Sequence, residues 1–204
     1  VFYFLGNEWD YTISKSIACL YKSTDKGENF EKIYTSTLNK NMCDLWSPPY
    51  DDNNVYFVHK DTLSQITSDG NLNFISLIDI ELSNIKQIRL DGNFSESNTT
   101  LVLYHLDKSN KSHFFNSTNT GESWTELGVV DYGPFSSNSF EVSNIYPEAV
   151  YFGGVECSRS HDGGDSWDIV NKWVQYYSDM ENKLHADIPA ITSFRNPDGE
   201  EVLI

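Results

Sequence analysis

An eight-residue pattern recurs along this chain and constrains its fold more than any other feature of the sequence. The pattern reads Ser-x-Asp-x-Gly-x-x-aromatic, and its copies begin at Ser23, Thr67, Ser117 and Ser160. A period of about 45 residues is typical of repeat architectures, in which one unit cannot bury its apolar face alone and neighbouring units stack. We call the copies turn motifs 1 to 4, in chain order.

Each turn motif predicts a tight loop between two strands. The Ser or Thr hydroxyl and the Asp or Asn side chain can bond nearby backbone N–H groups. The glycine supplies a left-handed conformation, and we expect the aromatic residue to open the outgoing strand and to bury apolar surface. The defining residues are Ser23, Asp25, Gly27 and Phe30; Thr67, Asp69, Asn71 and Phe74; Ser117, Asn119, Gly121 and Trp124; and Ser160, Asp162, Gly164 and Trp167. Motif 2 is the faintest copy.

Short β-rich runs between polar loops predict four-stranded blades with one turn motif per blade. The expected strands are 1–5, 17–21, 30–34, 44–46, 55–58, 63–66, 85–90, 100–104, 113–115, 140–142, 149–153, 157–159, 188–194 and 201–204. The expected fold class is therefore all-β, a β-propeller with approximate repeats 1–34, 35–77, 78–127, 128–170 and a partial repeat 171–204. Because both ends fall inside a blade, we expect about four blades of an incomplete propeller. A closed four-bladed ring is the alternative.

The four motifs resemble the Asp-box (BNR-type) repeat, which joins the third and fourth strands of β-propeller blades. Sialidases, some endoglucanases, sortilin-type receptors and a photosystem assembly factor share that repeat. The resemblance implies that the motifs are structural and lie away from any catalytic face. It also extends to a stretch after motif 4, which is similar to secreted Bacteroidetes propellers of the sialidase-like and sortilin-like kind.

That stretch holds the candidate ligand-binding residues, Trp173, Tyr176, Tyr177, His185 and Asp187. The three aromatic side chains would form a platform for a sugar ring or a peptide, or would simply pack a loop. We expect His185 and Asp187 to lie at the start of a strand and to point the same way. They would then coordinate a metal together with a third ligand or relay a proton, or act only as a polar latch between blades. Many relatives carry a second His where this chain has Pro189.

Charge limits the partners of this chain. It has 14 basic and 30 acidic residues, for a formal net charge of −16, which argues against nucleic acid and anionic membranes as partners. No apolar run is long enough for a membrane span, and no cofactor or metal is expected. Cys19, Cys43 and Cys157 have no metal-type spacing and are expected to be buried. Two acidic turns, at 51–54 and 162–165, lack the ligand pattern of a calcium loop and are expected to be solvated turns.

Four Asn-x-Ser/Thr sequons begin at Asn93, Asn98, Asn110 and Asn116. In a secreted eukaryotic protein they would mark a glycan-bearing face, but chance sequons are common in a chain rich in Asn and Ser. Glycosylation therefore stays open.

The sequence does not contain a recognisable set of catalytic residues. A sialidase needs an arginine triad with a Tyr nucleophile, and the chain holds only Arg89, Arg159 and Arg195. The acidic residues offer no distinct pair for a glycoside hydrolase of another kind. The sequence therefore predicts a secreted or cell-surface recognition and scaffold module that binds protein or glycan without catalysis. The first alternative is part of a glycoside hydrolase whose catalytic residues lie partly outside this chain. The second is a component of a larger secretion or assembly complex.

Overall fold

The structure is a computed structural model that describes residues 1–49, 54–95 and 98–204. The chain divides into two compact units, Val1–Leu90 and Asp91–Ile204. We call them unit 1 and unit 2 and describe each by itself. The predicted acidic turn at 51–54 lies outside the described residues except for Asn54.

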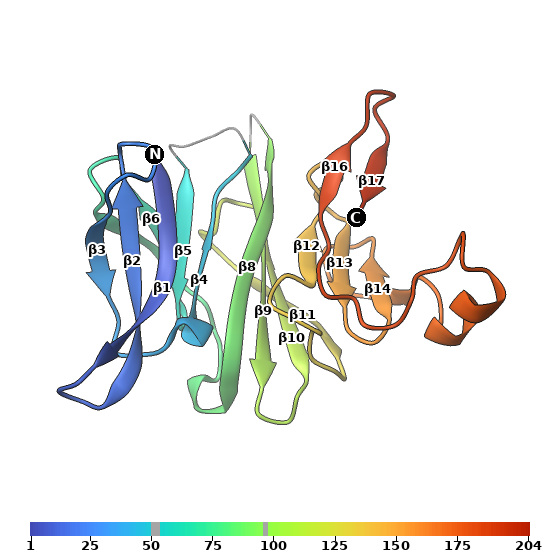
Figure 1. Cartoon of the computed structure of the whole chain (residues 1–204), viewed down its shortest axis with the longest axis horizontal. Coiled ribbons are helices and arrows are strands. Elements are labelled where there is room, and N and C mark those ends of the chain that lie inside the picture. The colour runs from blue at the N-terminus through green and yellow to red at the C-terminus, as the bar shows by residue number, and fades with distance from the viewer. Residues whose placement is uncertain (50–53, 96–97) are drawn as a thin grey trace. The chain divides into compact units, whose positions relative to one another are not determined.

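Unit 1 contains two antiparallel meanders (Figure 1). The first sheet has three strands, β1 (Phe2–Asp10), β2 (Lys15–Ser23) and β3 (Glu31–Thr35). The second sheet has four, β4 (Cys43–Trp46), β5 (Val55–His59), β6 (Thr62–Ile66) and β7 (Leu72–Leu77). A short 3-10 turn, η1 (Lys40–Met42), precedes β4, and another, η2 (Leu82–Asn84), follows β7.

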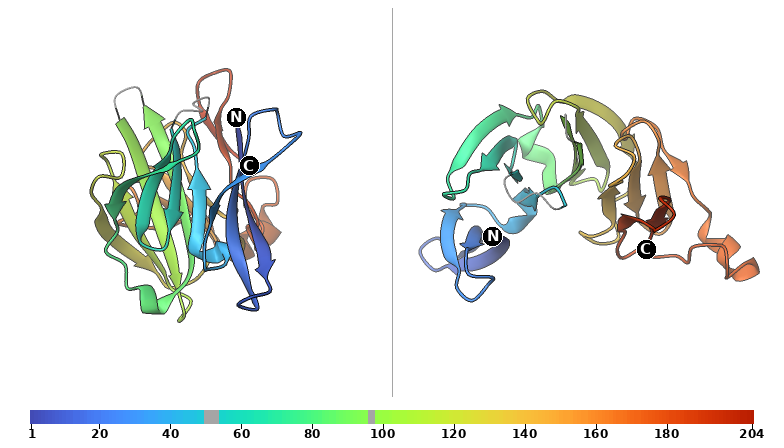
Figure 2. Two further views of the ribbon diagram at one scale, coloured as in Figure 1. Left: turned by 90° about the vertical axis from the view of Figure 1, so that its left-hand side faces the viewer. Right: turned by 90° about the horizontal axis from the view of Figure 1, so that it is seen from above.

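Unit 2 contains most of one four-stranded meander, whose first strand begins before the division, together with a second four-stranded meander and a hairpin (Figures 1 and 2). The first meander consists of β8 (Ile85–Ser95), β9 (Asn98–Asp107), β10 (Ser112–Ser117) and β11 (Thr125–Val130). The second consists of β12 (Phe140–Val142), β13 (Val150–Gly153), β14 (Cys157–Ser160) and β15 (Asp168–Ile169). A 3-10 segment, η3 (Trp173–Ser178), leads on to the hairpin of β16 (Ser193–Arg195) and β17 (Glu201–Leu203).

The predicted fold class is confirmed. The chain is all-β, and its sheets are sequential antiparallel meanders of the β-propeller type. Motifs 1 to 4 lie between the last two strands of successive sheets, after β2, β6, β10 and β14. They therefore close the outermost hairpin of each sheet.

Alternating side chains on the strands form the cores between neighbouring sheets. In unit 1, Ala18 and Leu20 of β2 pack with Val55 and Phe57 of β5. In unit 2, Tyr104 of β9 belongs to a second apolar cluster that joins two meanders; its buried members are Val102, Tyr104, Leu106, Phe114, Val130, Phe140, Val142, Val150 and Phe152. All three cysteines are buried and unpaired, as predicted.

Carboxylates on first strands bond to the first strand of the next sheet, which the sequence did not predict. In unit 1, the N–H of Leu90 donates to Asp44 at 2.9 Å. In unit 2, the N–H of Val142 donates to Asp91 at 2.7 Å, and the N–H of Ser193 donates to Glu141 at 2.8 Å. Three successive sheets thus use one device to fix their spacing and register.

Each of the fourteen expected strands has an observed counterpart in the same order, but the prediction missed β7, β11 and β15, the last strand of three sheets. Several boundaries differ as well. β1 continues to Asp10 and β8 to Ser95, beyond the expected ends at 5 and 90. The expected strand 188–194 is wrong over most of its length, because only Ser193–Arg195 is a strand. The preceding residues make a single parallel bridge, between Ala190 and Asn138.

Candidate functional site

The candidate ligand-binding residues lie on a long loop that leaves β15 and returns through residue 188. Buried Asn171 closes this loop through its side-chain amide. Its Nδ2 donates to the carbonyl oxygen of Leu184 at 3.1 Å, and its Oδ1 accepts the N–H of Leu184 at 3.0 Å. The amide therefore substitutes for one backbone pair of a β-ladder. We call residues 172–184 the η3 loop.

Further hydrogen bonds anchor the η3 loop to the turn between β13 and β14. The N–H of Trp173 donates to Glu156 Oε1 at 3.2 Å. After the loop, the N–H of Asp187 donates to the carbonyl of Val155 at 3.1 Å, and that of Ile188 to Gly154 at 3.0 Å. The loop thus has a defined base on unit 2.

Four aromatic rings gather on this segment: Trp173, Tyr176, Tyr177 and His185. The Tyr176 ring meets His185 edge-to-face at 4.7 Å and Tyr177 at 5.6 Å between centroids. Tyr177 in turn meets Trp173 at 6.0 Å. Edge-to-face pairs of this kind are the favoured arrangement of aromatic side chains. We call these four residues the aromatic cluster.

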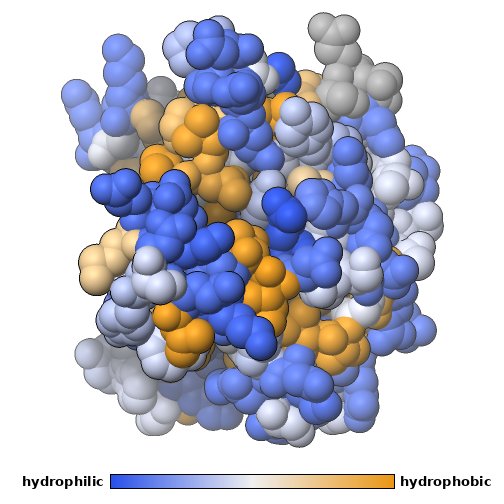
Figure 3. Space-filling view, turned by 90° about the vertical axis from the view of Figure 1, so that its right-hand side faces the viewer, coloured by the Kyte–Doolittle hydropathy of each residue, from blue (hydrophilic) through white to orange (hydrophobic). Residues whose placement is uncertain are grey.

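The aromatic cluster is largely open to solvent. Tyr177 is 61% exposed and Trp173 is 40% exposed. Large aliphatic side chains on the same loop are exposed as well, namely Val174, Met180 and Leu184. Figure 3 faces the side of the molecule that carries this loop and shows hydrophobic residues between hydrophilic ones. Exposed aromatic groups at this density are a common mark of binding surfaces.

His185 belongs to the aromatic cluster. The expected alignment of Asp187 with His185 is not observed. Neither residue lies on a strand, and Asp187 has a φ of 65°. The alternation that would point both side chains the same way therefore does not apply. His185 Nδ1 lies 2.8 Å from the carbonyl oxygen of Ala186, so Nδ1 carries the proton and Nε2 of the neutral ring is an acceptor. Among the described residues, no group of three His, Cys, Asp or Glu side chains could hold a metal.

The turn motifs are held by their own side chains. In motif 4 the Ser160 hydroxyl donates to Asp162 Oδ1 at 2.8 Å and accepts the N–H of Gly164 at 2.8 Å. Asp162 also accepts the N–H of Ser166 at 2.9 Å. The first and third motifs repeat this set of bonds with Ser23 and Ser117 as the hydroxyl residues.

Motif 2 forms a shorter turn than the other three. Its glycine, Gly70, stands one position earlier and has a φ of 90°. The N–H of Asn71 takes the bond to the Thr67 hydroxyl, at 3.1 Å. Strand β7 then begins at Leu72, five residues after Thr67, whereas β3 begins at Glu31, eight residues after Ser23.

The expectation that every motif aromatic buries its ring is wrong for unit 1. Phe30 is 48% exposed and Phe74 is 64% exposed. In unit 2, Trp167 packs on Phe114 at 4.6 Å between centroids and donates its indole N–H to the carbonyl of Gly164 at 3.0 Å. Because an indole reaches farther than a phenyl ring and carries a donor, it can cap the core and bond the turn together.

The Asn side chains of three sequons are hydrogen-bonded to the backbone. Asn93 is buried and its amide donates to the carbonyl of Ser143 at 2.6 Å. The amide of Asn116 points to the carbonyl of Gly163 at 3.4 Å. Asn110 lies exposed on the hairpin between β9 and β10. Asn98 Nδ2 likewise donates to the carbonyl of Thr118. The side-chain nitrogen that a glycan would need is thus engaged at Asn93, Asn98 and Asn116.

Two carboxylates approach each other near the C-terminal hairpin of unit 2. Glu201 accepts hydrogen bonds from the hydroxyls of Tyr151, at 2.7 Å, and Ser143. Glu141 accepts the hydroxyl of Ser193 at 2.9 Å, and its pKa is raised by burial and further by Glu201. Both groups are engaged in contacts between strands, so we assign them a structural role.

Two parts of this site could not be predicted from the sequence. Asn171 looks like an ordinary polar residue after a strand, and its role depends on Leu184, thirteen positions away. The exposed aliphatic residues of the η3 loop resemble core positions in the sequence. A run of apolar residues outside any alternating pattern is the only available signal, and that signal is weak.

No family model matches the chain, and no curated protein matches it. Among solved structures, a variant of AofleA from Arthrobotrys oligospora matches 98% of this chain at 12% identity with a TM-score of 0.49, and this chain spans 62% of that protein. The SapL1 lectin in complex with alpha methyl fucoside matches 98% of this chain, over 71% of its own length, at 11% identity and a TM-score of 0.49. The Hadza microbial sialidase Hz136 matches 92% of this chain, over 46% of its own length, at 13% identity and a TM-score of 0.44. In the described part of the chain, no helix has the length and apolar character to cross a membrane.

Proposed function

We propose that this chain is a recognition module that binds a glycan through the aromatic cluster, without chemistry of its own. The observation that carries the proposal is the group of four contacting rings, three exposed and Tyr176 half-buried, on a loop closed by Asn171. The module is expected to act outside the cell or at its surface.

The chemistry of the cluster suits a sugar ring. A pyranose has an apolar C–H face and a rim of hydroxyls. The Trp173 and Tyr177 rings supply apolar area at a low cost in side-chain entropy. The phenol groups and His185 Nε2 supply donors and acceptors at the ring edges. The net charge of −16 favours an uncharged glycan over an anionic one.

The test is binding of the purified chain to an array of neutral glycans, repeated with the double variant Trp173→Ala/Tyr177→Ala. We expect the variant to lose at least tenfold in affinity. The matched control is Tyr11→Ala, which removes an 87% exposed ring in unit 1 and should leave binding unchanged. Equal binding by the wild type and the double variant would contradict the proposal.

A protein partner is the second candidate, and the aliphatic side chains of the η3 loop favour it. Val174 and Met180 are 52% and 63% exposed, and a sugar ring does not need such groups. Under this candidate, Met180→Ser weakens binding to a purified partner as much as Trp173→Ala does. Under the glycan proposal, Met180→Ser has little effect on glycan affinity.

A further inference from the structure

We propose that the turn motifs carry a second kind of site, a pair of equivalent pockets that each hold one uncharged sugar ring. One pocket lies at motif 1 in unit 1, and the other lies at motif 3 in unit 2. The inference goes beyond the aromatic cluster, because neither pocket contains a residue of that cluster.

The two pockets occupy the same place in the repeat. Each has a volume of about 240 Å³. Four lining positions are shared, namely one before, one after, six after and eight after the first residue of the motif. They are Lys22, Thr24, Asn29 and Glu31 at motif 1, and Asn116, Thr118, Ser123 and Thr125 at motif 3. A hollow that recurs at matching positions of separate units is a property of the repeat.

The residue before each motif builds the floor of the pocket. Lys22 is 7% exposed and donates from Nζ to the carbonyl of Ser68 in motif 2. Asn116 donates from Nδ2 to the carbonyl of Gly163 in motif 4, at 3.4 Å. Each pocket therefore lies along the seam between two successive turn motifs of one unit.

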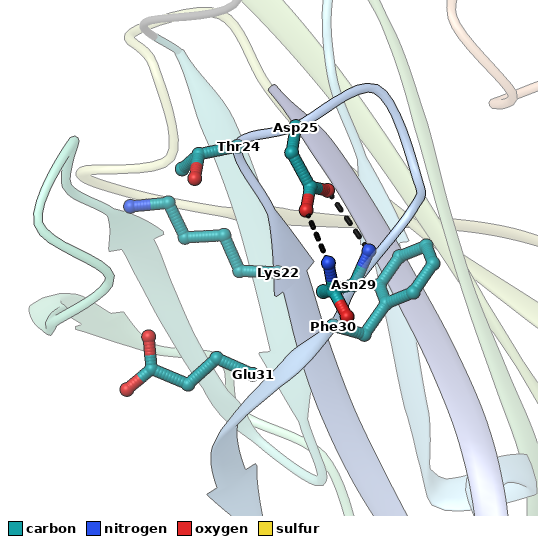
Figure 4. A pocket seen from close by; sticks show the side chains of 6 residues that line it. All are labelled: Lys22, Thr24, Asp25, Asn29, Phe30 and Glu31. Carbon is teal, nitrogen blue, oxygen red and sulfur yellow. Dashed lines mark hydrogen bonds between the residues drawn. The ribbon is translucent and has the colours of Figure 1, made fainter.

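One carboxylate in each pocket keeps an acceptor position for a ligand. Among the described residues, Asp25 uses Oδ1 for the Ser23 hydroxyl and the N–H of Asn29, and Oδ2 for the Asn29 amide. Figure 4 shows Asp25 held against Asn29, with Lys22, Thr24 and Glu31 projecting beside them. Asp162 lines the second pocket and uses Oδ2 only for the Ser166 hydroxyl. A carboxylate oxygen accepts two bonds, so each Oδ2 can accept one sugar hydroxyl.

The remaining lining groups match a sugar rather than an ion. The Phe30 ring and the Leu127 side chain give each pocket one apolar wall. Threonine hydroxyls supply donors and acceptors in both. The first pocket has two carboxylates against one ammonium, and the second has one carboxylate and no cationic side chain, so an anionic ligand is disfavoured. The small volume limits the occupant to one ring, because drug-sized ligands need roughly 300 Å³ or more.

The test is an NMR titration of the ¹⁵N-labelled chain with methyl glycosides of neutral hexoses and deoxyhexoses. We expect saturable shifts of the amides of residues 24–31 and 118–125, with a Kd on the order of 1 mM, as suits so few contacts. Methyl glucuronide, the anionic probe, is expected to leave these amides unmoved.

Matched variants separate the two pockets. Phe30→Ala is expected to weaken the motif 1 site about tenfold and to leave the motif 3 site unchanged. Its control is Phe74→Ala, which removes the equivalent exposed ring of motif 2, a ring that lines neither pocket. For the second pocket, Thr118→Val with Thr125→Val is compared with Thr37→Val, an exposed threonine outside both. The unperturbed spectrum of each variant shows that it has folded.

Absence of saturable shifts at both motifs with every neutral glycoside would overturn the inference. Shifts confined to residues 173–185 would also overturn it, while leaving the proposed function standing. Conversely, motif shifts that persist in the Trp173→Ala/Tyr177→Ala variant would support the pockets even if the aromatic cluster binds nothing.

Discussion

The second polar residue of the turn motif anchors backbone N–H groups, and its charge is not required for that role. Asn119 of motif 3 accepts the N–H of Ser123 at 3.0 Å, just as Asp162 of motif 4 accepts that of Ser166 at 2.9 Å. The amide of Asn119 turns its Nδ2 to the Ser123 hydroxyl, at 2.9 Å. The two motifs therefore form a natural comparison between a charged and a neutral anchor.

This comparison predicts the behaviour of Asp162 variants. Asp162→Asn keeps the acceptor oxygen but loses the charge, so it should be slightly less stable than the wild type at pH 7. Asp162→Ala should lose more, about 1 kcal/mol, because its N–H partners lose their acceptor. The hydroxyl and N–H of Ser166 lower the pKa of Asp162 to about 2. The charged form therefore stabilises the fold above about pH 4, and this contribution disappears as the pH falls to about 2.

Urea unfolding followed by tryptophan fluorescence between pH 2 and 7 measures this difference. The wild type should lose stability more steeply than Asp162→Asn below pH 4. An identical pH dependence for the two proteins would show that the Asp162 charge contributes nothing to the turn.

Asp44 presents the opposite case, a carboxylate whose charge costs stability. Enclosure by protein atoms raises the pKa of Asp44 to about 6, although Arg89 and the N–H of Leu90 favour the charged form. The folded state thus binds a proton more tightly than the unfolded chain, and wild-type stability should rise as the pH falls from about 6 to about 4.

Asp44→Asn should therefore be more stable than the wild type at pH 7.5, by about 1–2 kcal/mol. The amide oxygen can still accept the N–H of Leu90, so the bond to β8 is kept. The advantage should shrink as the pH approaches 4, where the wild-type carboxyl is protonated. Chemical denaturation at the two pH values measures it, and a variant less stable than the wild type at pH 7.5 would contradict the assignment.

At the scale of elements, the sequence predicts the strands and turns well because those depend on local chemistry. A β-rich run between a polar loop and a turn that contains a hydroxyl residue and a glycine can adopt few structures other than a strand. Successive strands then pair in sequence order to form the sheets. Strand ends are set by pairing with a partner instead. β1 reaches Asp10 because its residues pair with β2 as far as Lys15, which no local pattern in residues 6–10 announces.

The candidate site was predicted in its residues but not in its geometry. Trp173, Tyr176, Tyr177 and His185 do gather, but the strand expected to begin at residue 188, which would have aligned His185 with Asp187, is absent there. The loop is closed instead by a side-chain amide, since Asn171 pairs with both backbone groups of Leu184. Such a contact depends on how the loop folds back and cannot be inferred from spacing.

Asn171→Ala should therefore release the η3 loop while leaving the sheets of unit 2 intact. The N–H and C=O of Leu184 lose their partners, and the loop loses its closure. Hydrogen exchange is expected to accelerate at least tenfold at Leu184, whereas the amides of β9 keep their rates. Glycan affinity should fall even though every ring of the aromatic cluster is still present. Unchanged exchange at Leu184 would show that other contacts close the loop.

At the scale of the whole molecule, charge decides which ligands the chain can approach. The excess of 16 negative charges creates a field that repels anions and is screened over about 10 Å at 0.1 M salt. Each motif pocket is also lined by at least one carboxylate, Asp25 and Glu31 at motif 1 and Asp162 at motif 3. This field does not repel neutral glycans, whereas it repels sulfated glycans and glycans that contain uronic acids.

Salt dependence therefore tests the glycan class directly. From 50 to 500 mM NaCl, the Kd of a neutral glycan should change less than about twofold, because no ion pair is formed or broken. Any residual binding of an anionic glycan should strengthen over the same range as screening weakens the repulsion. Isothermal titration at several salt concentrations, with the neutral and the carboxylated form of one sugar, provides the comparison. An anionic glycan that binds more tightly at low salt would reveal a local cationic site and contradict a neutral ligand.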